Sequence, residues 1–341
     1  MDHSSLGEFE LIARLTQGLH SRADVALGVG DDCALLELGG DLQLLATCDS
    51  QVEGVHFTLQ TARPEQIGRK ALAVNISDIA AMGGVPRYAL ISLILPQQIA
   101  IETLEGIYRG LQQEAERYEL SLVGGNIASS HGSKQLIIDI TLLGTIERGR
   151  ALLRSGAEVG DLLCITGQPG SSAAGLYTLF HPDQPYDATA LISVQATHHT
   201  PEPRVSAGRL LSRFSPQQVT AALDVSDGLS GDLQHLCERS HVGALVEQAK
   251  LPISQHLFAI AQAARRDPFA WILHGGEDYE LLFTLKPSAQ QEVLKALWAE
   301  TGTPVSVIGA ILPESEGLRI RLLDGREEAL RAQSWDHLRQ S

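Results

Sequence analysis

Four segments of the chain place an aspartate after an apolar run and beside glycine, serine or a second aspartate. They are residues 28–32 (GVGDD), 46–49 (ATCD), 75–78 (NISD) and 224–228 (DVSDG). Ligands gather at strand ends in α/β sheets, so these acids could converge on one site. Converging carboxylates need a cation between them, and oxygen ligands without a histidine or cysteine cluster favour Mg²⁺. Magnesium in turn indicates phosphate chemistry.

Each of these aspartates, taken alone, has a simpler explanation as a helix N-cap or a turn residue. Asp227 has a further one, because Ser226-Asp227-Gly228 also fits a turn into a following helix. Four such sites in one chain shift the balance towards a shared metal site. Carboxylates repel the phosphates of ATP, so an acidic site can hold ATP only through bound cations. A cluster of aspartates therefore indicates that the nucleotide binds as a metal complex.

Three glycine-rich segments offer backbone amides close to a ligand. Residues 166–172 (TGQPGSS) lie between a predicted strand and a helical pattern, so their amides either cradle an anion or form a tight turn. They are not a Walker A loop, because the chain has no Gly-Lys-Ser/Thr. Residues 124–126 (GGN) end one predicted strand and residues 274–280 (HGGEDYE) precede another, as expected where backbone approaches a ligand.

Several side chains near these segments are ambiguous from sequence. Glu277 and Asp278 are either site residues or solvated loop charges. Arg154 lies at the predicted domain junction, where a guanidinium can bind phosphate oxygens in a bidentate manner, although most exposed arginines do not. His56 and Trp335 are equally consistent with packing and with chemistry.

The elements that must position these residues alternate between strand and helix. In the first half we expect strands at 42–48, 88–95, 120–123 and 136–143, and helices at 65–82 and 101–118. In the second half we expect strands at 162–166, 222–225, 244–246, 280–285, 305–311 and 318–323, and helices near 229–240 and 289–300. Residues 181–199 lack strong periodicity and are predicted to form a surface loop. The small, polar run near residue 150 marks a domain boundary.

Composition narrows the class of protein. A length of 341 residues favours two domains over one core. The net charge of −15, without a basic stripe, argues against a nucleic-acid surface. No signal sequence or apolar run of about 20 residues is present, so a cytoplasmic protein without membrane spans is expected. The scattered Cys33, Cys48, Cys164 and Cys237 indicate neither a zinc site nor a disulfide framework.

Segments along nearly the whole chain carry a family resemblance. They are GEFELIARL (7–15), GVGDDCALL (28–36), CDSQVEGVHF (48–57), KALAVNISDIAAMGGVPRYAL (70–90), GGN (124–126), RSGAEVGD (154–161), TGQPGSSAAGL (166–176), DVSDGLSGDL (224–233), HGGEDYELLFT (274–284) and SWDH (334–337). In this order they resemble the thiamine-monophosphate kinases. The combination is far more specific than any one motif.

The resemblance implies the two-domain fold of aminoimidazole ribonucleotide synthetase. Residues 1–150 would form an N-terminal α/β domain that binds ATP and magnesium and joins a partner's strands in a dimeric barrel. Residues 151–341 would form a C-terminal α+β domain that completes the active site. The implied reaction is direct transfer of the ATP γ-phosphoryl group to thiamine monophosphate, giving thiamine diphosphate and ADP without a phosphoenzyme.

The resemblance also assigns roles by motif position. The implied magnesium ligands are Asp32, Thr47, Cys48 through its backbone oxygen, Asp49, Asp78, Asn126, Asp224 and Asp227. The implied nucleotide contacts are Tyr108, Gly125, Asn126, Arg154 and Ser226, and the implied substrate contacts are His56, Glu277 and Trp335, whose ring would stack on thiamine. Asp49, Asp78, Asp224 and Arg154 form the expected catalytic set.

One position departs from the family pattern. Many members have aspartate where this chain has Asn126, so a formal charge is missing from the expected metal cluster. An amide oxygen still coordinates magnesium, but with lower expected affinity. The sequence therefore predicts a higher magnesium requirement.

Two alternatives remain open at this point. Sister enzymes of the superfamily use ATP differently, but the selenium enzyme needs a reactive residue near its start and the hydrogenase-maturation enzyme a C-terminal cysteine. Here the first cysteine is Cys33 and the last residues are Arg-Gln-Ser. A non-catalytic nucleotide-binding or metal-binding module is the other alternative, which the complete aspartate set disfavours.

Overall fold

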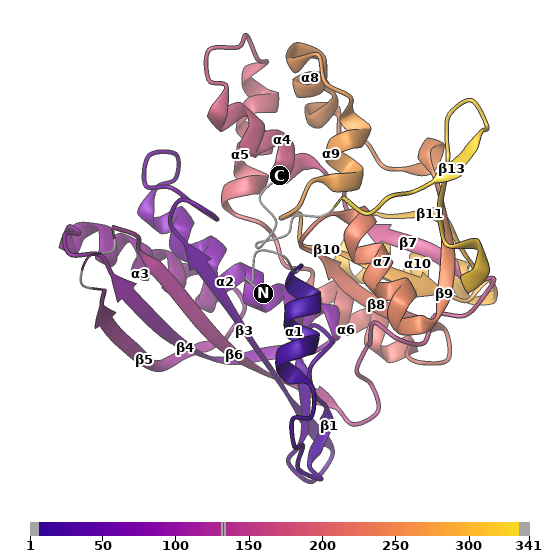
Figure 1. Cartoon of the computed structure of the whole chain (residues 1–341), viewed down its shortest axis with the longest axis horizontal. Helices are drawn as coiled ribbons and strands as arrows, with labels where there is room; N and C mark the ends of the chain where they lie inside the picture. Colours follow the sequence, from indigo (N-terminus) through magenta and orange to yellow (C-terminus); the bar gives the residue numbers. More distant parts are fainter. Residues whose placement is uncertain (1–6, 131, 133, 334–341) are drawn as a thin grey trace.

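The chain folds into two β-sheets with their own helices, and a cavity lies between the two domains. The computed structural model describes residues 7–130, 132 and 134–333, so Trp335 lies outside the described residues. Strands β1 to β6 form the first sheet, and strands β7 to β13 form the second. Figure 1 shows the first sheet and the second as separate layers, each with its own helices.

The first sheet has the order β1-β2-β3-β6-β4-β5. Its strands are β1 (Val25–Leu27), β2 (Ala34–Glu37), β3 (Leu42–Val52), β4 (Val85–Leu95), β5 (Ser121–Ser129) and β6 (Ile137–Glu147). Neighbours are antiparallel except β4 and β5, which run parallel. Two helices, α2 (Pro64–Ala81) and α3 (Ile101–Arg117), cover one face of this sheet (Figure 1).

Glycines allow α2 and α3 to pack closely. A Cβ on Gly68 would lie 2.0 Å from the Ile107 carbonyl oxygen, and one on Gly110 would lie 2.0 Å from that of Glu65. Burial of Ile76 and Ile79 against strand residues such as Ile140 then anchors α2 to the sheet. Helix α2 is almost entirely buried, because the second domain packs on its remaining side.

The second sheet has the order β13-β12-β9-β11-β7-β10-β8. Its strands are β7 (Leu162–Thr166), β8 (Val219–Val225), β9 (Val242–Glu247), β10 (Glu280–Leu285), β11 (Val305–Pro313), β12 (Leu318–Arg321) and β13 (Glu327–Ala329). Side chains alternate between two cores: Leu223 and Val225 pack in one, and Ala222 in the other. The sheet is therefore covered on both faces.

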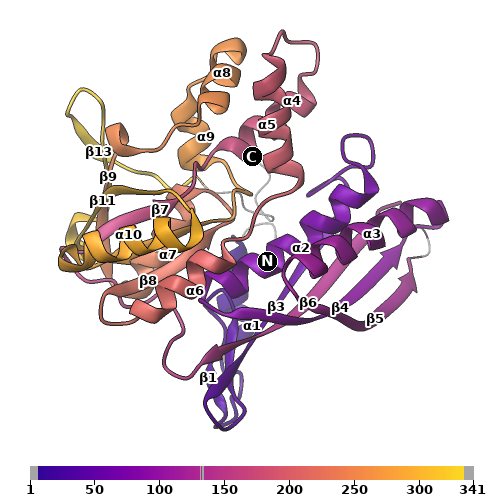
Figure 2. The same ribbon diagram turned by 180° about the vertical axis from the view of Figure 1, so that it is seen from behind.

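Seven helices belong to this second layer among the described residues. They are α4 (Ser171–Phe180), α5 (Ala188–His199), α6 (Val205–Phe214), α7 (Leu229–Ser240), α8 (Gln255–Ala264), α9 (Pro268–His274) and α10 (Gln290–Thr301). Figure 2 shows α10 and α6 on the side of the sheet away from α4, α5 and α8. Helix α6 also touches α2, since a Cβ on Gly208 would lie 2.0 Å from the Ala80 carbonyl oxygen.

Two local predictions were wrong. Residues 181–199 do not form a loop throughout, because α5 begins at Ala188 with Asp187 as a capping residue. Ala190, Val194 and His198 are buried at intervals of four, a helical stripe obscured because Ile192 is apolar but exposed and His198 is polar but buried. Residues 124–126 do not end a strand, since β5 continues to Ser129.

Within the described residues, no helix is long and apolar enough to cross a membrane.

Candidate active site

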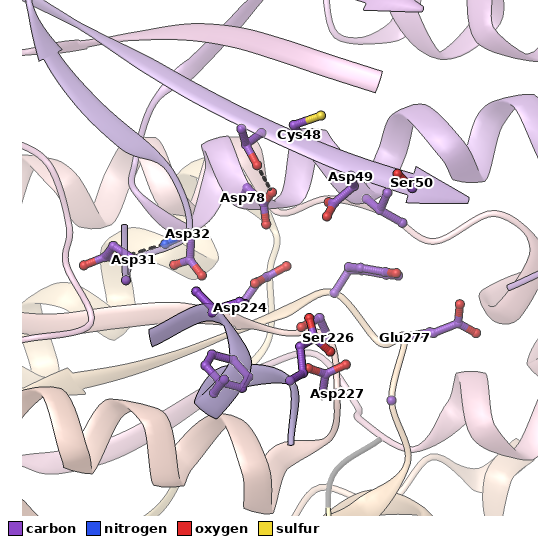
Figure 3. Close-up of a pocket in the computed structure, with 18 of the residues that line it drawn as sticks. Asp31, Asp32, Cys48, Asp49, Ser50, Asp78, Asp224, Ser226, Asp227 and Glu277 are labelled. Atoms are coloured by element: carbon purple, nitrogen blue, oxygen red, sulfur yellow. Dashed lines mark hydrogen bonds between the residues drawn. The ribbon is translucent and has the colours of Figure 1, made fainter. Parts of the chain in front are cut away.

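A cavity of about 810 Å³ lies between the two domains. Residues of the first sheet, of α2, of the loop after β8 and of the segment before β10 line it. Helix α1 (Glu8–Thr16) borders it as well, with Phe9 stacked on His235. Figure 3 shows the acidic side chains of both domains pointing into this space.

Three carboxylates converge at one end of the cavity. Asp32 follows β1 in a loop, Asp78 lies in the last turn of α2, and Asp224 lies near the end of β8. One oxygen atom from each lies within 4.8 Å of the other two (Figure 3). The structure thus brings three of the four aspartate segments together at a spacing suited to a shared cation.

Hydroxyl groups orient two of these carboxylates. Thr47 donates a hydrogen bond of 2.5 Å to Asp78, and Ser77 donates one of 2.5 Å to Asp224. Asp49, the acid of the remaining segment, lines the same cavity, and its backbone N–H donates to the Asn75 side chain at 3.2 Å. The cluster is therefore preorganised by neighbours on β3 and α2.

Arg154 closes one side of the cluster. Its Nε donates to Asp32 Oδ1 at 3.0 Å, and Nη2 contacts the same oxygen. Its backbone N–H donates to Asp31 at 3.1 Å. Asp31 thus fixes the backbone of Arg154 and Asp32 fixes its guanidinium at the wall of the cavity, and a guanidinium there could bind phosphate oxygens.

The electrostatics of the cluster call for a cation. Burial, followed by the charge of Asp32, raises the pKa of both Asp31 and Asp224 to about 7. Burial and the charge of Asp49 raise the pKa of Asp78 well above its usual range. Asp32 Oδ2 is buried and accepts no hydrogen bond from any described residue. An orphaned carboxylate oxygen among carboxylates fits Mg²⁺, which takes hard oxygen ligands.

The loop after β8 supplies Ser226 and Asp227 to the cavity. Asp232, in the first turn of α7, accepts hydrogen bonds from the backbone of Asp227 at 3.2 Å and of Gly228 at 3.1 Å. The simple turn expected from the sequence therefore exists, and it also carries side chains into the site. Asp232 itself was not predicted, although it lies in the DVSDGLSGD segment.

His56 and Glu277 also line the cavity. His56 Nδ1 accepts the backbone N–H of Val52 at 3.0 Å, which leaves its other ring nitrogen to carry the proton. Glu277 is not a solvated loop charge, since Lys70 Nζ lies 2.6 Å from its carboxylate. Sequence reasoning gave Lys70 no role, and the available signal was a lysine directly before the apolar run 71–74.

Asp278 has a different role from Glu277. It is buried, and it accepts hydrogen bonds from Gly170 N at 2.5 Å and Ser172 N at 3.1 Å, at the start of α4. Burial raises its pKa to about 8. These two amides of the TGQPGSS segment therefore bind Asp278, which corresponds to the tight turn expected as one alternative for that segment.

Three predicted nucleotide contacts lie away from this cavity. Tyr108 packs partly buried on α3, and Gly125 and Asn126 lie on β5, the edge strand of the first sheet. Strand register places Asp49 and Gly125 three strands apart, roughly 14 Å. One chain cannot hold a single ion through both Asp49 and Asn126, so Asn126 is no ligand of the cluster in its own chain.

The structure adds detail to two further expectations. The Cys48 side chain points away from Asp78, on the opposite side of β3 (Figure 3), so only its backbone faces the acids. The glycine of residues 124–126 that most needs its small size is Gly125, where a Cβ would lie 1.7 Å from the Ile91 carbonyl oxygen. This close approach of β5 to β4 is what requires a glycine at position 125.

Comparison with known proteins places the chain in a family. Residues 30–146 match the N-terminal domain model of AIR synthase related proteins, and residues 158–320 match the C-terminal one. The thiamine-monophosphate kinase of Bacillus subtilis (strain 168) is 37% identical over 98% of this chain and 100% of its own length. The chain belongs to the thiamine-monophosphate kinase family.

Other members of the family show the same full-length likeness. The thiamine-monophosphate kinase of Escherichia coli (strain K12) is 38% identical over 97% of this chain and 98% of its own. A solved structure, AaThiL complexed with AMPPCP and TMP, has 33% identity and a TM-score of 0.84 and covers 99% of both chains. The two-domain AIR synthase-like fold expected from the sequence is confirmed.

The family matches also locate the cavity within the chain. The N-terminal match contains Asp32, Asp49 and Asp78, and the C-terminal match contains Asp224 and Glu277. Arg154 lies in the segment between the two matches. Both AIR synthase-like domains of this thiamine-monophosphate kinase family member thus contribute carboxylates to one site.

Proposed function

We propose that this protein is a thiamine-monophosphate kinase, which transfers the γ-phosphoryl group of ATP to thiamine monophosphate. The main support is the cluster of Asp32, Asp78 and Asp224 in the cavity, together with the membership of the chain in that family. Support also comes from the related structure, whose description includes AMPPCP and TMP. The products would be ADP and thiamine diphosphate, a step of thiamine diphosphate biosynthesis.

Several ions of Mg²⁺ fit the donor set as it stands. Asp32, Asp49, Asp78, Asp224 and Asp227 would hold them, with Thr47 and the Cys48 backbone oxygen beside them. When bound, Mg²⁺ neutralises and aligns the phosphate groups of both substrates. The carboxylates are fixed beforehand by Thr47 and Ser77, so little reorganisation is needed at the moment of reaction.

The protein groups around the cluster position charge and do not form a covalent intermediate. Arg154, held by Asp31 and Asp32, would face the phosphate oxygens where negative charge spreads during transfer. Ser226 would contact the nucleotide. A phosphate monoester is largely ionised at pH 7, so the acceptor needs no general base. The transfer is then direct and in line.

The acceptor's thiamine moiety would occupy the part of the cavity away from the cluster of Asp32, Asp78 and Asp224. His56 and Glu277 lie there and offer a ring N–H and a carboxylate. Trp335, outside the described residues, stays a predicted stacking partner for the ring. The division at residue 150 likewise stays a proposal: residues 1–150 would bind nucleotide and magnesium, and residues 151–341 would complete the site.

We also propose a homodimer formed through the open side of the first sheet. Val123 and Ile127 on the edge strand β5 are 55% and 65% exposed, and Tyr88 and Leu90 on β4 are exposed beside them. An apolar, unpaired edge of this length is a surface that a second copy can cover in a joint barrel. Tyr108, Gly125 and Asn126 would then serve the partner's nucleotide site.

A direct assay tests the kinase proposal. ADP release from Mg-ATP is measured with and without thiamine monophosphate, and thiamine diphosphate is detected by fluorescence after oxidation to its thiochrome form. We expect one thiamine diphosphate for each ADP. ATP binding without any product would contradict the proposal and favour a sister synthetase or a non-catalytic relative.

A further inference from the structure

Lys70 is a buried cation to which the proposed mechanism gives no role. It lies on α2 within the KALAVNISD segment and is only 4% exposed. Its Nζ lies 2.6 Å from Glu277 Oε1 and donates to the backbone oxygen of His56 at 3.4 Å. One ammonium group therefore connects both of the proposed acceptor contacts, which come from different domains.

The second oxygen of Glu277 also has a partner. His198 Nδ1, on α5, lies 3.4 Å from Glu277 Oε2 and 3.1 Å from Ser172 Oγ. Burial, followed by the charge of Lys70, lowers the pKa of His198 to about 2, so the ring is neutral. Lys70 is accordingly the cation that balances the Glu277 carboxylate.

The backbone around Glu277 is held in an uncommon conformation. Glu277 and Tyr279 have φ values of 65° and 53°, in the left-handed region. Hydrogen bonds from Glu277 N to Ser226 O at 2.6 Å and from Tyr279 N to Val225 O at 2.8 Å tie this segment to the loop after β8. Such strain persists only where surrounding contacts fix the chain, and it is concentrated at functional sites.

Helix α2 sets the distance between the two ends of the cavity. Lys70, Val74 and Asp78 are spaced at four-residue intervals, so they share one face of the helix. Eight residues span about 12 Å, so Lys70 lies about two turns from the metal cluster. Lys70 is thus too far from Asp78 to act on the transferred phosphoryl group, and close to where the rest of the acceptor would bind.

We propose that Lys70 is a positioning residue for the phosphoryl acceptor: it orients the Glu277 carboxylate and the His56 turn across the domain boundary. The inference rests on the proposed kinase function and deepens it. Because Lys70 acts at the acceptor end, it contributes to binding of thiamine monophosphate and not to binding of Mg-ATP or to transfer itself. A purely structural ion pair, in contrast, would affect stability without selecting one substrate.

The first test separates the two Michaelis constants of the full-length enzyme. For Lys70→Met we expect KM for thiamine monophosphate to rise about 10- to 100-fold, since a charge-assisted contact is lost, with KM for Mg-ATP and kcat nearly unchanged. Lys70→Arg should restore part of the loss. A fall in kcat at unchanged KM, or equal effects on both substrates, would overturn the proposal.

A double-mutant cycle tests whether Lys70 acts through Glu277. Glu277→Gln should raise the same KM, and the variant that combines it with Lys70→Met should be scarcely worse than Glu277→Gln alone. Additive effects would contradict the proposed pathway. If Lys70→Met is unstable, Lys70→Gln can replace it in the cycle, because it also removes the charge.

Lys286→Met is the matched control. Lys286 pairs with the buried Asp161 at 2.8 Å and with Glu158 at 2.7 Å, away from the cavity lining. We expect it to lower Tm while leaving both KM values unchanged. The wild-type enzyme is assayed first: absence of thiamine monophosphate-dependent ADP release would refute the kinase function, whereas an active wild type with an unaltered Lys70→Met refutes only the role of Lys70.

Discussion

Ser77 and Asp224 join the two domains at the centre of the cavity by a hydrogen bond of 2.5 Å. Ser77 lies on α2, which packs on the first sheet, and Asp224 lies on β8 of the second sheet. Both are buried. The metal cluster therefore depends on the correct docking of the two domains and not only on local loop structure.

The first prediction concerns the charge of Asp224. Asp224→Asn keeps the size of the side chain and an oxygen for Ser77 to donate to, but it removes a metal-binding charge. We expect turnover to fall at least about 1,000-fold, with Tm and circular dichroism close to those of the wild type.

Two further variants complete this test. Asp49→Ala should abolish turnover in the same way, whereas Asp324→Asn, which removes an exposed aspartate paired with Arg326, should not. Substantial activity in both cavity variants would be incompatible with a magnesium cluster at this position.

The second prediction links pH, magnesium and stability. The folded-state pKa values of Asp31 and Asp224, about 7, lie above the ordinary value of 3.8. Between these values the folded state binds more protons than the unfolded state, so the metal-free protein loses stability as pH rises from about 4 through 7. Mg²⁺ competes with those protons, so its stabilising effect should grow over the same range.

Differential scanning calorimetry with EDTA or with MgCl₂ from pH 5 to pH 8 measures this effect. We expect the difference in Tm between the two conditions to widen with pH in the wild type and to widen less in Asp224→Asn. A difference that is independent of pH would show that cations and protons do not compete at these carboxylates.

Much of this arrangement follows from the sequence because it is local. Short apolar runs predicted β10 and the buried strand of Asp224, and apolar runs that stop at an acid indicated Asp32, Asp49 and Asp78, which line the cavity. These patterns reflect which side chains must leave water and where the chain must turn. They carry no information about which carboxylates share an ion.

The remainder is set by contacts between distant segments. Lys70 appears in sequence as one of several charges in a predicted helix, and only the fold places Glu277, which is 207 residues later, 2.6 Å away. The buried stripe of α5 was hidden because Ile192 is apolar but exposed and His198 is polar but buried. Asn126 was assigned by motif position, but strand order separates it from Asp49.

The third prediction concerns the amide of Asn126. If Asn126 contributes an oxygen to a metal site, Asn126→Asp adds a charge and should lower the Mg²⁺ concentration for half-maximal activity several-fold. Initial rates at saturating ATP and thiamine monophosphate, measured over a MgCl₂ titration, give this concentration. Asn126→Ala should shift it in the opposite direction, and identical titrations for all three proteins would exclude Asn126 as a ligand.

The fourth prediction decides which chain Asn126 serves. Asp224→Asn and Asn126→Arg are expected to be inactive as homodimers, since each damages both sites. In a heterodimer of the two, exchange of β5 residues between subunits would leave one site with both defects and the other with none. Such a heterodimer, isolated with two different affinity tags, should then have about half of the wild-type activity.

A second heterodimer provides the control for this experiment. Asp224 and Asp49 line the same cavity of one chain, so a heterodimer of Asp224→Asn with Asp49→Ala has one defect in each site and should be inactive. If the Asn126→Arg heterodimer is equally inactive, Asn126 does not complete the partner's site. Activity in the first heterodimer alone would explain why β5 lies about 14 Å from the acids of its own chain.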